Sequence, residues 1–417
     1  MPDGSMIRNT GRPGCDAAPG LLSPAEARHR LLAAAVPVCG VETLLAADAL
    51  GRVLVEAPRA RQSLPPFDQS AMDGYGLAAE DLRAGASPRV ARMVTAGAVP
   101  GPALMPGEAV RLMTGAALPE GVAAVVMEEH AAAAGGCIQP RRIVRAGENI
   151  RRRGEDVTEG EALASPGTRL DARHAALFAA ARVAEVLVRR RVRVATLSNG
   201  DELGQAVQDS NRPMLHALLA RPEVALTDLG VLPDDPAALA AALAEAAAGQ
   251  DLILATGGVS GSDADHMPAA IRRAGGSVEV LKLALKPGKP LAFGRIGQAM
   301  CLCLPGNPLA ALVTMLVLGR PLLGRLAGLP DAPAAPLAAV AGEGFTRVPG
   351  REEYVPARVA GTDEAGLPVL LRAGRAGSAR LKPLAQADGL LWLPAGCEAV
   401  APGDALRFHP FATPFGL

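Results

Sequence analysis

The chain has 417 residues, which is too long for one ordinary hydrophobic core and predicts about two to four domains. Hydrophobic residues make up 49% and charged residues 20%, as in globular rather than disordered proteins. Basic and acidic residues number 42 each and aromatic residues are only 2%, so we expect no nucleic-acid and no membrane partner.

The first part of the chain is predicted to be helical and then β-rich. Residues 1–21 are rich in Gly, Pro and polar residues, and we expect them to be disordered. A capping box with proline at the first helical position starts a helix at 23–35, and a second helix is expected at 41–50. Short β segments between turns follow at 52–144, and Asp171 then caps a further helix.

From residue 191 onwards, strands alternate with helices. Strands and helices of these lengths predict an α/β domain with a doubly wound, mostly parallel sheet. The whole chain is therefore divided into a disordered N-terminus (1–21), a helical N-terminal domain (22–50 with 148–190), an inserted β-rich domain (51–147), the α/β domain (191–330) and, after a proline-rich linker, a small C-terminal β domain (337–417).

The six cysteines form no CxxC pair, and the histidines show no metal-ligand spacing to them. Cys301 and Cys303 alternate along an apolar run, so we expect both on one strand face as small hydrophobic residues. The most apolar segment, 309–318, is followed by Arg320 and Pro321 and is predicted to be too short to span a bilayer. Reduced thiols and the lack of a signal-peptide pattern predict a cytoplasmic protein.

The segment 251–266, DLILATGGVSGSDADH, joins a buried strand to a helix through a glycine turn. Gly257 and Gly258 let the backbone approach a ligand, and free N–H groups at a helix start attract anions. Asp263 and Asp265 beside such a pocket indicate a divalent cation that bridges the protein and a phosphate. Simple capping of the helix by these aspartates is the alternative.

Other strand ends of the α/β domain also carry charged residues. Glu202 follows one strand, Asp235 precedes a helix and could simply cap it, and Lys286 and Lys289 lie in the stiff loop KPGKP. The rigid turn LPGNP, 304–308, could turn its N–H groups towards an anion. The carboxyl ends of parallel strands share one edge, so we expect these groups to converge there with Asp265.

Two polar segments lie outside the α/β domain. The segment PPFDQSAMDGYGL, 65–77, contains Asp68, Gln69 and Ser70 and is either a functional loop or an ordinary turn. The segment GENIRRRGEDV, 147–157, has three arginines that suit an oxyanion, although a solvated charged turn is the simpler interpretation.

Taken in order, PPFDQSAMDGY, GENIRRRGEDV, NGDEL, TGGVSGSDAD, KPGKPLAFG and LPGNP resemble the molybdopterin molybdenumtransferase family, which includes the C-terminal part of gephyrin. The resemblance covers nearly everything from about residue 22 to 417. It implies a four-domain elongated homodimer whose α/β domain is similar to the molybdopterin adenylyltransferases. It also implies a reaction in which adenylyl-molybdopterin and molybdate give molybdenum cofactor and AMP with a divalent cation, which we take to be Mg²⁺.

The resemblance also assigns roles to individual residues and partners. It implies that Asp68 and Asp156 reach the cleft from the other subunit. Protein partners would be the molybdopterin adenylyltransferase and molybdoenzyme chaperones. Catalytic roles fall on Asp68, Asp156, Glu202, Asp235, Asp265, Pro305 and Pro308. Ligand-binding roles fall on Gly257, Gly258, Ser260, Lys286, Lys289, Asn307 and Ser70, and metal-binding roles on Asp235, Asp265 and Glu202.

The chain departs from the family pattern at four places. The family more often has Thr at Asn199, Asn at Gln69 and an aromatic residue at His266, and the segment 203–209 is shorter than usual. These departures concern ligand affinity more than reaction type. Two other functions remain open: a molybdopterin-binding scaffold without turnover, which retention of all five acids argues against, and the adenylyltransferase reaction, which the 65–75 region argues against.

Overall fold

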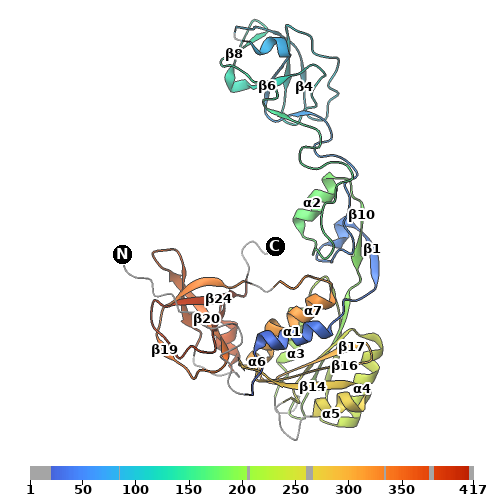
Figure 1. The fold of residues 1–417 in the computed structure, drawn as a ribbon, viewed down its shortest axis with the longest axis vertical. Coiled ribbons are helices and arrows are strands. Elements are labelled where there is room, and N and C mark those ends of the chain that lie inside the picture. Colours follow the sequence, from blue (N-terminus) through green and yellow to red (C-terminus); the bar gives the residue numbers. More distant parts are fainter. Residues whose placement is uncertain are drawn as a thin grey trace.

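A computed structural model of the protein shows an elongated molecule (Figure 1). An inserted β domain lies at one end, a small unit with α2, β1 and β10 follows, and the α/β domain and the C-terminal β domain lie together at the other end. The structure describes residues 20–83, 85–203, 207–259, 266–332, 335–374 and 380–412.

The α/β domain is built on a six-stranded sheet of order β12-β11-β13-β17-β16-β14. The first four strands are parallel to one another, and β16 and β14 run antiparallel at the other edge, so the expected mostly parallel sheet is present. Its strands are β11 (Val192–Asn199), β12 (Val224–Leu232), β13 (Leu252–Thr256), β14 (Ser277–Lys282), β16 (Pro290–Ile296) and β17 (Ala299–Leu304), and its flanking helices include α3 (Asn211–Leu219), α4 (Pro236–Gly249) and α5 (His266–Arg273).

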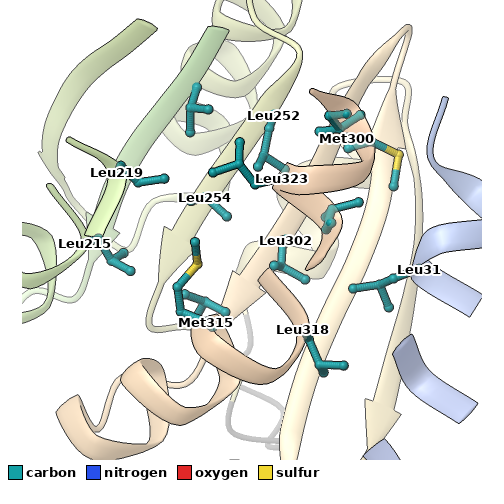
Figure 2. Close-up of a cluster of buried hydrophobic side chains, with 14 of the residues drawn as sticks. Leu31, Leu215, Leu219, Leu252, Leu254, Met300, Leu302, Met315, Leu318 and Leu323 are labelled. Carbon is teal, nitrogen blue, oxygen red and sulfur yellow. The ribbon is translucent and has the colours of Figure 1, made fainter. Parts of the chain in front are cut away.

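Hydrophobic side chains fill both faces of this sheet. Leu252 and Leu254 of β13 pack on one face in the cluster that contains Leu31 (Figure 2). The alternate residues Ile253 and Ala255 pack on the opposite face against α4 and α5. Period-two alternation along a strand therefore supplies two cores, which is what a doubly wound sheet requires.

Cys301 and Cys303 lie together on one face of β17, as their alternation predicted. Both are buried, and burial raises the pKa of the Cys301 thiol to about 12 and that of Cys303 further. These two residues, Cys39, Cys137 and Cys397 are free thiols.

A long apolar helix covers the first of these two faces. It comprises α6 (Pro308–Thr314), a π-helical turn (Met315–Gly319) and α7 (Arg320–Leu326). The expectation that this segment is too short to cross a bilayer was wrong, because the helix continues through Pro321 for 19 residues and is long and apolar enough by composition. It is 67% buried, and Met315, Leu318 and Leu323 pack against the sheet (Figure 2).

The helix α1 (Pro24–Ala34) packs beside α7, although its residues come from the N-terminal segment. The predicted capping box is present: the Ser23 hydroxyl accepts the amide of Glu26 at 3.2 Å, and the Glu26 carboxylate accepts the Ser23 amide at 3.1 Å. Leu31 joins the core on the face of the α/β sheet that α6 and α7 cover. The first helix of the chain therefore belongs to the α/β core.

The second predicted helix, at 41–50, is wrong. Residues Val41–Leu45 form β1, which pairs antiparallel with β10 (Glu185–Arg189), and only Ala46–Ala49 make a short 3-10 helix. Pairing with a strand about 140 residues later overrides the local helix propensity. The helix α2 (Ala172–Ala180) packs there, and Asp171 caps it as predicted.

The inserted domain has a six-stranded sheet of order β6-β3-β5-β4-β8-β7. Its elements are β3 (Gly74–Leu77), β4 (Arg89–Val94), β5 (Glu108–Leu112), β6 (Ala124–Met127), β7 (Ala131–Ala134), β8 (Cys137–Pro140) and short 3-10 helices at Ala79–Leu82 and Glu128–His130. The pair β2 (Gln69–Ser70) and β9 (Ile150–Arg151) joins the two polar segments at its base.

The C-terminal domain is built on a third six-stranded sheet, of order β15-β20-β21-β18-β24-β22. Its first strand, β15 (Leu285–Lys286), belongs in sequence to the α/β domain and pairs parallel with β20. The other elements are β18 (Leu337–Ala341), β19 (Phe345–Thr346), β20 (Glu352–Thr362), β21 (Pro368–Arg372), α8 (Leu381–Ala385), β22 (Gly389–Leu393), β23 (Ala399–Val400) and β24 (Ala405–Pro410).

Candidate functional site

A cavity of about 1000 Å³ lies at the carboxyl edge of the α/β sheet, where this edge faces the C-terminal domain. One wall is formed by the ends of β11, β13 and β17 and by the loop 286–290. The opposite wall comes from residues between 345 and 383. Ligands of doubly wound proteins bind at the carboxyl ends of the strands, so this cavity is the candidate site.

The glycine turn after β13 is pressed against Asn199 at the end of β11. Gly257 has φ +94° and Gly258 has φ +64°, which side chains with a Cβ rarely adopt. A Cβ on Gly257 would lie 2.4 Å from the Asn199 carbonyl oxygen, and one on Gly258 would lie 2.7 Å from Asn199 Nδ2. Both glycines line the cavity, so only glycine allows this backbone to reach the ligand space.

Asn199 and two aspartates hold the neighbouring loops together. Asn199 Nδ2 donates to Asp234 Oδ1 at 2.9 Å, and the amides of Asp201 and Asp234 each donate to the other residue's carboxylate, at 3.3 and 3.0 Å. A carboxylate can only accept, so this bond fixes the orientation of the Asn199 amide. Its Oδ1 is buried and has no hydrogen-bond partner among the described residues, which leaves an acceptor for a ligand or water.

Of the predicted acids, the structure brings Glu202 to the cavity wall, and Asp234 lies there rather than its neighbour Asp235. The Asp235 carboxylate accepts the amide of Ala237 at 2.9 Å and caps α4, which is the alternative role that the sequence left open. A metal-binding role for Asp235 stays a prediction. Asp234 was missed because two adjacent aspartates before a helix give no indication of which one turns inward.

The turn after β17 forms the next part of the wall. Pro305, Gly306 and Asn307 line the cavity, and Pro308 is the first residue of α6. Asn211 Nδ2 of α3 donates to the Gly306 carbonyl at 2.7 Å. A Cβ on Gly306 would lie 3.6 Å from Gly257 Cα, so the turns after β13 and β17 lie in contact.

The two lysines of the KPGKP loop both line the cavity. Lys286 Nζ lies 2.9 Å from Glu353 Oε1 of the C-terminal domain, whereas Lys289 is exposed. The loop is held by pairing of β15 with β20 and by the bond from the Leu283 amide to the Lys289 carbonyl, at 2.7 Å. Positive charge therefore stands at the junction of the two domains.

The C-terminal wall was not found from the sequence, where residues after 337 show only short strands and turns. It contributes Arg347, Arg351, Glu353, Tyr354 and Arg380 to the cavity lining. Burial raises the pKa of Tyr354, so its phenol stays protonated at neutral pH. The motif segments contained no indication that a basic wall would come from this domain.

The polar segments of the N-terminal half form a separate cluster. Arg152 donates to Asp68 Oδ2 at 2.6 Å, and the Arg153 amide donates to Oδ1 at 2.8 Å. The bond from the Arg153 amide, with that from Arg152, holds the pKa of Asp68 below its ordinary value. Arg151 pairs with Glu155 at 2.7 Å. These arginines therefore have carboxylate partners, as in the simpler interpretation of a charged turn.

Asp156 and Ser70 belong to the same cluster. Asp156 is exposed, and its amide donates to the Leu64 carbonyl at 3.0 Å. Ser70 is buried and its hydroxyl donates to the Met72 carbonyl at 2.6 Å. Asp68, Asp156 and Ser70 are not among the residues that line the cavity of their own chain.

Three predicted residues, Ser260, Asp263 and Asp265, lie outside the described residues. Within the part of the chain that is described, no group of three or more His, Cys, Asp or Glu side chains is arranged to hold a metal ion. The carboxylates of Glu202 and Asp234 at the cavity wall are nevertheless oxygen donors of the type that Mg²⁺ prefers. The donor chemistry present thus fits a divalent cation.

Family models match almost the whole described chain. Residues 22–181 match the MoeA N-terminal region (domain I and II), residues 195–325 match a probable molybdopterin binding domain, and residues 338–411 match the MoeA C-terminal region (domain IV). The three matches follow the order of domains seen in the structure.

Relatives with these names are similar over most of the chain. The molybdopterin molybdenumtransferase of Haemophilus influenzae is 37% identical over 74% of this chain and 78% of its own length. Molybdopterin molybdenumtransferase 2 of Mycobacterium tuberculosis is 34% identical over 91% of this chain and 97% of its own. The crystal structure of the molybdopterin biosynthesis moeA protein from Pyrococcus horikoshii is 26% identical, covers 94% of this chain and 100% of its own, and superposes with a TM-score of 0.78. The chain therefore belongs to the molybdopterin molybdenumtransferase family.

Proposed function

We propose that this protein inserts molybdenum into molybdopterin by converting adenylyl-molybdopterin and molybdate to molybdenum cofactor and AMP, with Mg²⁺ as the divalent cation. The observation that carries the proposal is the composition of the cavity. A glycine turn at a strand end, carboxylates and lysines line the same space. A pyrophosphate-containing ligand and an oxyanion need these three kinds of group together.

The α/β wall would bind the pyrophosphate. Gly257 and Gly258 bring the backbone to the cavity lining because they lack a Cβ that would collide with Asn199, and Ser260 is the predicted hydroxyl donor of the same segment. Asp235, Asp265 and Glu202 are the predicted metal ligands, and Asp234 adds a carboxylate at the same wall. These residues would hold a divalent cation, which would supply Lewis-acid stabilisation of phosphate charge.

The basic groups at the domain junction would bind molybdate. Lys286 and Lys289 of the KPGKP loop and Arg351 of the C-terminal domain line the same cavity. Placing the dianion next to the anhydride would couple cleavage of the anhydride to insertion of the metal into the dithiolene. Ammonium and guanidinium groups attract such an anion most strongly where water is partly excluded.

The test replaces the predicted metal ligands without removing their capping ability. Asn caps a helix nearly as well as Asp but lacks the charge. We expect Asp265→Asn and Asp235→Asn to melt near the wild-type temperature and to bind adenylyl-molybdopterin, yet to release no AMP with molybdate and Mg²⁺. Asp171→Asn is the matched control, because Asp171 also caps a helix but lies outside the cavity lining. Turnover at the wild-type rate in Asp265→Asn would return that residue to a capping role.

The same assay separates the other two functions. Binding of adenylyl-molybdopterin by the wild-type protein without AMP release would indicate a scaffold. In a parallel assay with ATP and molybdopterin but no molybdate, consumption of ATP would indicate an adenylyltransferase. We further propose a cytoplasmic location and transient contacts with the adenylyltransferase and molybdoenzyme chaperones, because the ligand is passed between proteins.

The proposed active unit is a homodimer. Asp68 and Asp156 do not line the cavity of their own chain, so acids at these positions can serve the cavity only from a second copy. Exposed Val41 and Leu45 on the two-stranded unit offer apolar surface for such an association. Light scattering at micromolar concentration should give twice the 42.4 kDa chain mass, and a monomer would contradict the proposal.

A further inference from the structure

Lys286 is already paired with a carboxylate from the opposite domain. Its Nζ lies 2.9 Å from Glu353 Oε1, and the two residues are also aligned in the pairing of β15 with β20. The Glu353 side chain is only 13% exposed, and both residues line the cavity. A negative charge therefore stands inside a cavity whose other wall residues include five cations, Lys289, Arg347, Arg351, Arg372 and Arg380.

The position of Glu353 is fixed by Arg347, whose side chain is 3% exposed. Arg347 Nε donates to Glu353 Oε2 at 2.7 Å. Its Nη1 donates to the carbonyls of Pro394 and Cys397, at 2.8 and 2.7 Å, and its Nη2 donates to the carbonyl of Arg351. Four of the five N–H groups of Arg347 are thus used within the C-terminal domain, and its guanidinium holds the Glu353 carboxylate and the backbone of Arg351 in place.

We propose that Glu353 sets the affinity of the cavity for anions by acting as a built-in competitor for the ammonium group of Lys286. This inference rests on the proposed function, in which an oxyanion occupies the cavity. An incoming oxyanion must draw Lys286 away from a carboxylate that Arg347 prevents from moving aside. Glu353 is therefore a specificity-determining residue. It weakens the binding of an oxyanion that contacts Lys286 alone. An anionic ligand that also contacts the other lysines and arginines of the cavity wall is weakened less.

The physical reason is the fixed geometry of the competition. A mobile surface carboxylate would move into water when an anion arrives, and its effect would be small. Glu353 is held at Oε2 by Arg347 and is largely buried, so its charge stays close to the anion and repels it at reduced dielectric screening even after Lys286 has moved. Removing that charge should strengthen anion binding, which is the opposite of what loss of a merely structural ion pair would do.

The test measures binding of molybdate alone to the full-length protein by isothermal titration calorimetry. We expect Glu353→Gln to bind molybdate on the order of tenfold more tightly than the wild type, because a like charge near the dianion has been removed. Glu364→Gln is the matched control: it makes the same change in net charge on an exposed residue outside the cavity lining and should leave the affinity unchanged. Melting curves of both variants report on folding.

Two further variants assign the effect to Lys286. In Glu353→Gln combined with Lys286→Gln, the gain should disappear, because the released ammonium is no longer there to bind the anion. Glu353→Asp keeps a carboxylate for buried Arg347 but withdraws it from Lys286, so it should give a smaller gain even if Glu353→Gln fails to fold. Unchanged or weaker molybdate binding in the folded variants, or a gain that persists without Lys286, would overturn the inference. AMP release by the wild-type protein is measured separately, so failure of the inference is distinguishable from failure of the proposed function.

Discussion

The molecule contains two clusters of acidic and basic residues, and they differ in how their charges are satisfied. At the base of the inserted domain, Asp68 is bound by Arg152 and by the Arg153 amide, and Arg151 is bound by Glu155. At the edge of the α/β sheet, Lys289 is exposed in the cavity lining, and Asn199 keeps a buried acceptor without a partner among the described residues. These charges of the first cluster are paired within their own chain, whereas the second cluster presents groups to a ligand.

This difference separates structural charge from charge available for binding. Both clusters look alike in the sequence, because each combines acids, bases and glycines from separate short polar segments. Only the partners of each group distinguish them. Asp68 is already bound by Arg152 and the Arg153 amide, so its charge is partly neutralised before any second subunit could use it.

The largest effect is expected for a substitution in the glycine turn at the sheet edge. Gly257→Val places a Cβ 2.4 Å from the Asn199 carbonyl oxygen at a φ of +94°, so the turn must move out of the ligand space. We expect a loss of about 3 kcal/mol or more in the free energy of unfolding and no binding of adenylyl-molybdopterin. Chemical denaturation and calorimetry measure both quantities.

The contrast is Gly147 in the other cluster, which also has positive φ but no heavy atom within 4 Å of a built Cβ. Gly147→Ala should cost only the backbone strain, about 1 kcal/mol, and leave ligand binding intact. Equal losses of ligand binding in the two variants would mean that the two clusters do not differ as described.

Mixed dimers would show whether the two clusters work together across subunits. Asp68→Ala and Asp265→Ala homodimers should each lose on the order of a hundredfold in AMP release, because each cleft lacks one acid. In a mixed dimer one cleft has both lesions and the other has neither, so up to half the normal activity should return. If verified subunit exchange restores nothing, both acids act on the cleft of one chain.

A smaller effect is expected for the local pairing of Asp68. Its folded-state pKa is lowered by the Arg153 amide and Arg152, so its carboxylate stabilises the fold above the ordinary Asp pKa, and this contribution is lost as pH falls through the folded-state value. Asp68→Asn should therefore cost about 0.5–1 kcal/mol at pH 7 for this partly exposed pair, and progressively less as the pH falls through the folded-state pKa. Urea unfolding at several pH values measures the difference, and a constant loss at all pH values would exclude an electrostatic cause.

The smallest effect on function is expected for the buried thiols behind the sheet edge. With its pKa near 12, Cys301 stays protonated at neutral pH, and Cys303 has a raised pKa as well. Cys301→Ala and Cys303→Ala should each cost about 1 kcal/mol of stability and leave AMP release unchanged. In native protein, iodoacetamide should label exposed Cys39 and spare both. Lost turnover in the folded double variant would show that the thiols take part in the chemistry.

Periodicity and caps predicted most of the α/β domain, because β13, α4 and the helix from Pro308 are specified by neighbouring residues. Strand β1 was taken for a helix, because nothing within 41–50 indicates its partner β10. The glycine turn, Glu202 and both lysines were placed at the correct edge by the rule that parallel strands share their carboxyl ends. Arg351 and Glu353 were not found, since their approach depends on docking of a separate sheet.

The pairing of β15 with β20 has a consequence for how the protein matures during synthesis. The KPGKP loop is completed by a strand that begins at residue 352, and β20 itself pairs with β22, which ends at residue 393. A ribosome that has finished the α/β sequence has therefore made only half of the cavity. Ligand binding becomes available last, when the final tenth of the chain has emerged, so a truncated product would carry the sheet edge and its glycine turn without a functional pocket.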